Sequence, residues 1–174
     1  MSESFSEYAI AHEAGHAVVG QFVKIAAPLG ISFFLKRGTD SQLYLGDFAT
    51  TFLFPPDNEI PELPDGVKNC LCYTLAAGIA ATQFSGLSLP EENNGLSSDI
   101  ELMAKITSKP FESFVPYALA IIGKEEKAYH EVISQCLRKY HELKTHSVDE
   151  GRQVLLAVSE LEAIFNKFTD GPAR

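Results

Sequence analysis

The segment AHEAGHAVVG, from Ala11 to Gly20, places two histidines four residues apart with a glutamate directly after the first. On a helix, positions i and i+4 share a face, so His12 and His16 can offer two nitrogens to one metal ion. This HExxH spacing is typical of zinc peptidases, in which the glutamate, here Glu13, is the general base. The alternative is a surface helix that carries two unrelated histidines. The apolar flanks favour the metal, because buried imidazoles need polar partners.

A catalytic zinc ion needs a third protein ligand and an open position for water. The candidates are His130, His141, His146 and the acidic residues. Asp99 is attractive because we expect it at the first position of a helix, with its side chain directed out of the helix end. The alternative is that Asp99 only interacts with the helix dipole. The three other histidines lie on a charged helical stretch, where exposure to solvent is the simpler expectation.

Hydrophobic periodicity predicts the elements that position these residues. Apolar residues recur with helical spacing over residues 6–26, and Pro28 and Gly30 close this first helix. Residues 31–54 are rich in Phe, Leu, Tyr and Thr around the turn-forming cluster RGTDS, which predicts a β-hairpin or small sheet. The proline-rich residues 55–66 predict a surface loop.

Residues 67–84 predict a second helix, in which Gly78, Ala80 and Ala81 allow another backbone to approach closely. A loop is expected over residues 85–96.

The next helix is predicted to begin at a capping box formed by Ser98 and Glu101 and to end at residues 109–110. The remainder is predicted to be helical, with breaks at Pro116 and Gly123.

Ser147 and Glu150 form a second capping box, which predicts a last helix running to about Phe168.

Residues 1–174 are predicted to form a single zinc metallopeptidase-like domain. We expect it to be mainly α with a small β-hairpin or sheet, an α+β fold with the zinc helix buried at its centre.

Composition excludes several classes of function. A net charge of -9 opposes nucleic-acid binding, which needs clustered Lys and Arg. Three cysteines, without a CxxC pair or an even count, fit buried thiols in a reducing compartment. The start of the chain lacks the pattern of a secretion signal, and the apolar runs are too short to span a membrane, so we expect a cytoplasmic protein.

The motifs HEAGHAVVG, PLGISFFLKRG, YLGDF, LAAGIAA and LSSDIELM resemble, in order and spacing, the peptidase domain of the FtsH family of ATP-dependent zinc metalloproteases. The similarity covers residues 8–106. It implies that His12, His16 and Asp99 bind zinc and that Glu13 is the base.

The chain departs from the FtsH pattern at three positions of its second predicted helix. Thr82 and Gln83 stand where the family has paired acids, and Ile79 stands where it has an arginine, so the surroundings of the zinc ligands are altered. A GxxxxGK[ST] phosphate loop is also missing, so the chain does not use ATP itself.

Two hypotheses follow. The first is a zinc metalloendopeptidase that hydrolyses unfolded or flexible polypeptides without its own ATPase, served by a separate partner ATPase. Residues 31–54 would then offer a strand edge to the peptide, unless this hairpin only covers the core. The second is a catalytically inactive FtsH-like domain that acts as an interaction or regulatory subunit of an FtsH-type protease. The apolar side of residues 124–146 packs either on the core or on another copy in a homo-oligomer.

Overall fold

The computed structural model describes residues 3–37, 39, 43–88, 95–144 and 150–169. Within these ranges the chain is mainly helical with a small antiparallel sheet, which confirms the predicted α+β class. The helices are α1 (Glu3–Val23), α2 (Asp65–Phe84), α3 (Gly95–Ile106), α4 (Val115–Lys124), α5 (Glu126–Lys144) and α6 (Val158–Thr169). The strands are β1 (Pro28–Arg37), β2 (Leu43–Phe52) and β3 (Gly151–Ala157), and two short 3₁₀ helices are η1 (Ile60–Glu62) and η2 (Phe111–Ser113).

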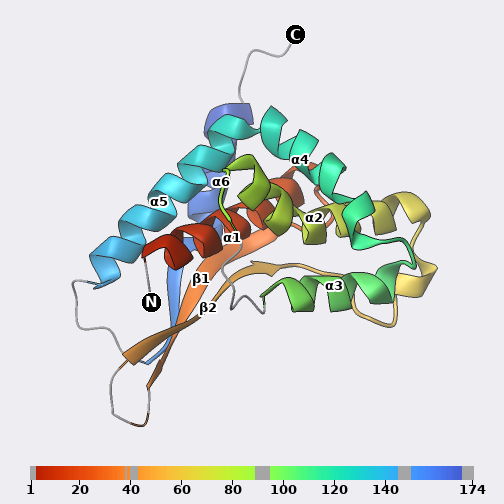
Figure 1. The fold of residues 1–174 in the computed structure, drawn as a ribbon. Helices are drawn as coiled ribbons and strands as arrows, with labels where there is room; N and C mark the ends of the chain where they lie inside the picture. Colours follow the sequence, from red (N-terminus) through yellow and green to blue (C-terminus); the bar gives the residue numbers. More distant parts are fainter. Residues whose placement is uncertain (1–2, 38, 40–42, 89–94, 145–149, 170–174) are drawn as a thin grey trace.

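Helix α1 crosses the centre of the molecule, between the sheet and α2 (Figure 1). It contacts α2, α4, α5, β1 and β2, and most of its side chains are buried. The helix ends before residue 26, because Lys24 adopts a left-handed conformation with φ of 57°. None of the helices in the described ranges combines the length and the hydropathy that a membrane span requires.

The sheet has the order β2-β1-β3, with antiparallel pairing on both sides of β1. The predicted hairpin is present as β1 and β2, and Ile31 of β1 lies opposite Thr50 of β2 and Leu156 of β3. The last predicted helix is present as α6, but the prediction that it opens at Glu150 is wrong, because residues 151–157 form β3. Ser147 lies outside the described residues. The central residues of β1 are buried, so the second edge of this strand needs a hydrogen-bonding partner, and β3 provides one.

Helix α2 confirms the second predicted helix and packs closely on α1. A Cβ atom at Gly15 of α1 would overlap the Ala77 carbonyl oxygen and the Ala81 methyl group of α2, so only glycine permits this approach. The predicted loop over residues 55–66 contains η1, and part of the loop over residues 85–96 lies outside the described residues.

Helix α3 begins earlier than predicted, so Ser98 and Glu101 lie inside the helix and do not cap it. Asp99 is therefore not at the helix start either. It shares one face of α3 with Leu102, Met103 and Ile106, and this face turns toward the core. The side chain of Asp99 thus leaves the flank of the helix, not its end.

The helical remainder is divided into α4 and α5, which meet at Glu125. Pro116 lies in the first turn of α4, where its missing N–H is tolerated, so it begins a helix instead of breaking one. The cysteines are free thiols.

Candidate metal centre

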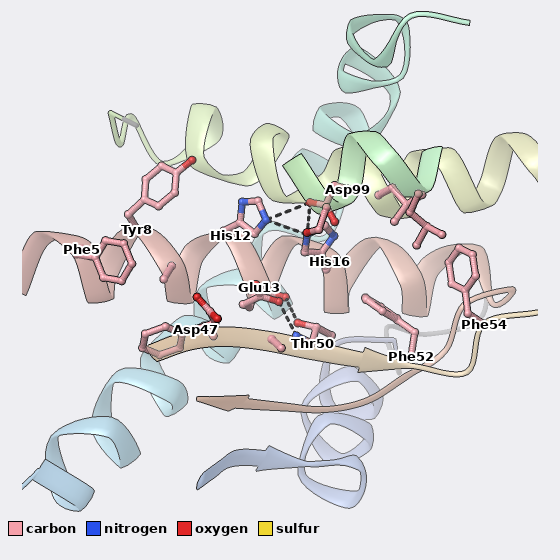
Figure 2. Close-up of a pocket in the computed structure, with 16 residues that line it drawn as sticks. Phe5, Tyr8, His12, Glu13, His16, Asp47, Thr50, Phe52, Phe54 and Asp99 are labelled. Atoms are coloured by element: carbon pink, nitrogen blue, oxygen red, sulfur yellow. Dashed lines mark hydrogen bonds and ion pairs between the residues drawn. The ribbon is translucent and has the colours of Figure 1, made fainter. Parts of the chain in front are cut away.

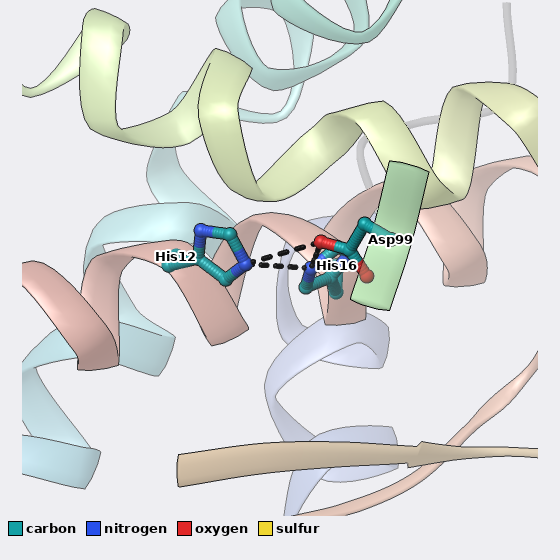
Figure 3. Close-up of side chains that lie close together, drawn as sticks. All are labelled: His12, His16 and Asp99. Atoms are coloured by element: carbon teal, nitrogen blue, oxygen red, sulfur yellow. Dashed lines mark hydrogen bonds and ion pairs between the residues drawn. The ribbon is translucent and has the colours of Figure 1, made fainter. Parts of the chain in front are cut away.

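The two histidines of α1 point to the same place and meet Asp99 of α3 there (Figure 3). His12 is 6% exposed and His16 is 4% exposed. Their Nε2 atoms lie 3.0 Å apart. The Asp99 Oδ2 atom lies 3.3 Å from His12 Nε2 and 3.2 Å from His16 Nε2. Three atoms that commonly bind metals therefore form a nearly equilateral triangle.

The size of this triangle fits a tetrahedral metal ion. Two ligands bound tetrahedrally to zinc at about 2.0–2.1 Å are about 3.3 Å apart. The observed separations are 3.0, 3.2 and 3.3 Å. Among the described contacts, Asp99 Oδ2 accepts no well-aligned hydrogen bond, although it is buried. Clustered lone pairs repel one another unless a proton or a cation lies between them, so the donor set fits a divalent cation.

The imidazole of His16 is oriented by the main chain of α2. Its Nδ1 atom lies 2.7 Å from the carbonyl oxygen of Thr74, which can only accept a hydrogen bond. Nδ1 must therefore carry the proton, and neutral His16 presents the lone pair of Nε2 to Asp99. This arrangement is the usual way in which a metal-binding histidine is fixed.

The imidazole of His12 is held differently. Its Nδ1 atom is buried and has no hydrogen-bond partner among the described residues. The ring lies against Gly78 of α2, where an added Cβ would overlap His12 Cε1 and Nε2. Thr82, where the FtsH family has an acid, is buried and donates its hydroxyl to the Ile79 carbonyl at 2.9 Å. On the Nδ1 side of the ring, packing against Gly78, and not a hydrogen bond, holds His12 in place.

Without a metal, the triad is an ion pair. Burial alone would lower the pKa of His16, but the Asp99 carboxylate outweighs burial and raises it to about 9. Burial alone would raise the pKa of Asp99, but the adjacent imidazoles of His16 and His12 lower it well below its usual range. Below a pH of about 9, the raised pKa of His16 therefore favours a positively charged ring beside the Asp99 carboxylate.

Glu13 lies between the two histidines in sequence, and its carboxylate turns toward β2 (Figure 2). Its Oε2 atom accepts a hydrogen bond of 2.6 Å from the backbone N–H of Thr50. Its carbonyl oxygen accepts a second one, of 2.9 Å, from the Thr50 hydroxyl. Thr50 thus ties both the side chain and the main chain of Glu13 to the sheet.

The triad and Glu13 line one cavity of about 640 Å³ between α1, β2 and α3. Aromatic side chains lie at both ends of this cavity, Phe5 and Tyr8 at one end and Phe52 and Phe54 at the other (Figure 2). Phe48, Leu75 and Leu102 also line it. The cavity has room for several residues of a peptide, and β2 forms part of its wall.

The structure brings together His12, His16 and Asp99 from the candidate ligands. His130 and His141 are exposed on α5, and His146 lies outside the described residues. Within the described ranges, this triad is the one group of three such side chains close enough to share a metal ion. Sequence reasoning missed the contacts of the Thr74 carbonyl and of Thr50, and it named Gly78 for close helix packing but not for contact with His12. Only Gly78 gave a signal, as a small residue in an apolar helix.

The comparisons with known proteins add no relative to this picture. Neither the models of known protein families nor the curated protein sequences gave a match to this chain.

Proposed function

We propose that this protein is a zinc metalloendopeptidase of FtsH-like type. The observation that supports the proposal is the convergence of three metal-binding atoms, within 3.3 Å of one another, in a cavity that also contains the Glu13 carboxylate. His12, His16 and Asp99 would hold the ion. Two imidazoles and one carboxylate are a ligand set of catalytic zinc sites, which leave a position for water.

When bound, zinc activates water as a nucleophile at neutral pH and polarises the carbonyl group of the peptide. Glu13 would accept the proton of the attacking water and deliver it to the leaving amine. One oxygen of Glu13 is bonded to the Thr50 N–H, so the second oxygen is the one that takes this proton. As zinc ligands, His12 and His16 would use the lone pairs of their Nε2 atoms, and the Thr74 carbonyl keeps His16 in the required tautomer.

The substrate class follows from the cavity walls. Among the described residues, β2 pairs with β1 alone, so its other edge can pair with an extended peptide. Main-chain pairing gives little sequence preference, and only an unfolded or flexible polypeptide can adopt such a conformation. A separate ATPase that unfolds proteins would extend the range of substrates.

The test combines metal content with cleavage. We expect the wild type to bind one zinc ion and to cleave casein, and Glu13→Gln to keep zinc and lose at least about 100-fold of the activity. His12→Gln should lose zinc as well. His130→Gln, which changes an exposed histidine on α5, is the matched control and should behave as the wild type. Wild-type protein that binds no zinc would rule out the metal site.

A second candidate function is that of an inactive subunit that regulates an FtsH-type protease. The observations that favour it are that His12 Nδ1 has no hydrogen-bond partner among the described residues and that Thr82 and Gln83 stand in place of acids. Such a subunit would bind zinc but cleave neither casein nor short peptides. Zinc-loaded but inert wild type would therefore support this function over the first.

A further inference from the structure

We infer that Thr50 is a positioning residue for the general base, and that it holds Glu13 at the edge of β2 in a productive orientation. This inference rests on the proposed function, because it concerns the same reaction. It begins from two hydrogen bonds that join one residue of the sheet to one residue of the metal-binding helix.

The first bond fixes the carboxylate. The distance of 2.6 Å between Thr50 N and Glu13 Oε2 is short, as expected for a bond to a charged acceptor. Because Oε2 is committed to this N–H, the carboxylate cannot rotate freely about its last side-chain bond. The remaining oxygen then has one preferred direction, which is what a general base needs.

The second bond fixes the distance between the two elements. The Thr50 hydroxyl donates to the Glu13 carbonyl oxygen at 2.9 Å, so β2 stays close to α1 at this level. This carbonyl belongs to the middle of a helix and already serves as an acceptor there, so the extra bond is not needed to complete α1. Its effect is to keep the Thr50 N–H within reach of the carboxylate.

The position of Thr50 in the sheet supports this role. An N–H directed at Glu13 faces away from β1, so it lies on the free edge of β2, where the cavity begins. Thr51, the next residue, instead accepts a hydrogen bond of 2.8 Å from Arg152 of β3. Two adjacent threonines thus have separate tasks: Thr50 contacts the metal-binding helix, and Thr51 contacts the third strand.

The test replaces the hydroxyl without changing the shape of the side chain. Thr50→Val removes the bond to the Glu13 carbonyl and suits a strand equally well. We expect kcat for a peptide substrate to fall by about 3- to 10-fold, the value of one hydrogen bond, while KM and zinc content stay within about twofold. Thr50→Ser keeps the hydroxyl and should recover most of the lost kcat.

Thr51→Val is the matched control, because it removes an equivalent hydroxyl from the same strand. It should retain wild-type kcat, and equal losses in Thr50→Val and Thr51→Val would overturn the inference as general loosening of β2. A faster Thr50→Val enzyme would also overturn it, because Thr50 would then restrain the base. If the wild type cleaves nothing, the proposed function fails together with this inference, whereas an active wild type with an unaffected Thr50→Val overturns this inference alone.

Discussion

The two histidines of the triad are held in opposite ways. On the His16 side, the Thr74 carbonyl accepts a hydrogen bond of 2.7 Å, and the ring of Phe52 lies edge-on with centroids 6.0 Å apart. On the His12 side, Nδ1 has no partner among the described residues, and the ring rests on the backbone of Gly78. A hydrogen bond to Thr74 orients the His16 ring. The His12 ring lies against the backbone of Gly78, which has no side chain to displace it.

In the proposed metal site, only one of the two histidines would have the usual hydrogen bond to its second ring nitrogen. A hydrogen bond to the second nitrogen fixes a ring and makes it a better ligand, whereas packing can only fix the ring. Small changes in packing around His16 should therefore have little effect on zinc affinity. On the His12 side, a change in packing should lower zinc affinity, and an added hydrogen-bond acceptor should raise it.

The largest effect is expected for Gly78→Ala. The new methyl group would overlap the His12 ring, and because the backbone of α2 is buried here, the ring must leave the triad. Zinc affinity should fall about 1,000-fold or more, which is about 4 kcal/mol, because one of three ligands is lost. Competition with a chelating dye measures this affinity.

Gly66→Ala is the matched control, since it makes the same change in the same helix where no other atom lies within 4 Å. It should leave zinc affinity unchanged and stabilise the fold slightly, by up to about 1 kcal/mol. A Gly78→Ala protein that binds zinc as tightly as Gly66→Ala would show that His12 is not held by this contact.

The ion pair of His16 with Asp99 should give the zinc-free protein an unusual pH dependence. Asp99 raises the pKa of His16 from 6.5 to about 9. Between pH 6.5 and pH 9 the folded protein therefore binds a proton that the unfolded chain does not. The stabilisation is complete below pH 6.5 and is lost as the pH rises through 9. The free energy of unfolding should fall by about 2–3 kcal/mol over this range, as measured by urea denaturation.

Asp99→Asn removes the charge that raises the pKa of His16 and should flatten this profile. The zinc-bound protein should show the opposite trend, because zinc binds deprotonated ligands and so binds better as the pH rises. Equal slopes for the zinc-free wild type and Asp99→Asn would contradict the ion pair.

Much of the fold could be predicted from local periodicity. Helices α1 and α2 and the hairpin of β1 and β2 each depend on a pattern within one segment. Strand β3 could not be found in this way, because its role is to pair with β1, and contacts such as Ser32 with Arg152 join residues 120 positions apart. The run VLL in β3 fits a helix or a strand equally well, and only the open edge of β1 decides between them.

In the candidate site too, local patterns could be predicted from the sequence and long-range contacts could not. The i, i+4 spacing predicts that His12 and His16 share a face, and the structure places them so. Asp99 was considered for a position at a helix end that it does not occupy. The apolar residues at 102, 103 and 106 were the better signal, because they place Asp99 on the buried face of α3. The contacts of Thr74 and Thr50 involve backbone groups, which the sequence does not reveal.

A moderate gain in zinc affinity is expected for Thr82→Glu, which places a hydrogen-bond acceptor near His12. Thr82 lies one turn beyond Gly78 on the face of α2 that packs on α1, and it is buried. A carboxylate there can accept the proton of His12 Nδ1, and zinc affinity should rise about tenfold. Gln83→Glu adds the same charge at the neighbouring exposed position and should change affinity by less than about twofold. A Thr82→Glu protein with unchanged affinity would show that the missing acceptor does not limit binding.

The smallest effect is expected for Phe52→Leu on the His16 side. The substitution removes the edge-on aromatic contact but leaves the Thr74 hydrogen bond, which depends on the main chain. Zinc affinity should therefore fall only about two- to threefold, less than the usual worth of an aromatic pair, since the ring stays oriented. Phe54→Leu makes the same change elsewhere in the cavity and should have no effect on affinity. If Phe52→Leu instead lowers affinity by 100-fold, His16 depends on packing as much as His12 does, and the two sides of the triad are alike.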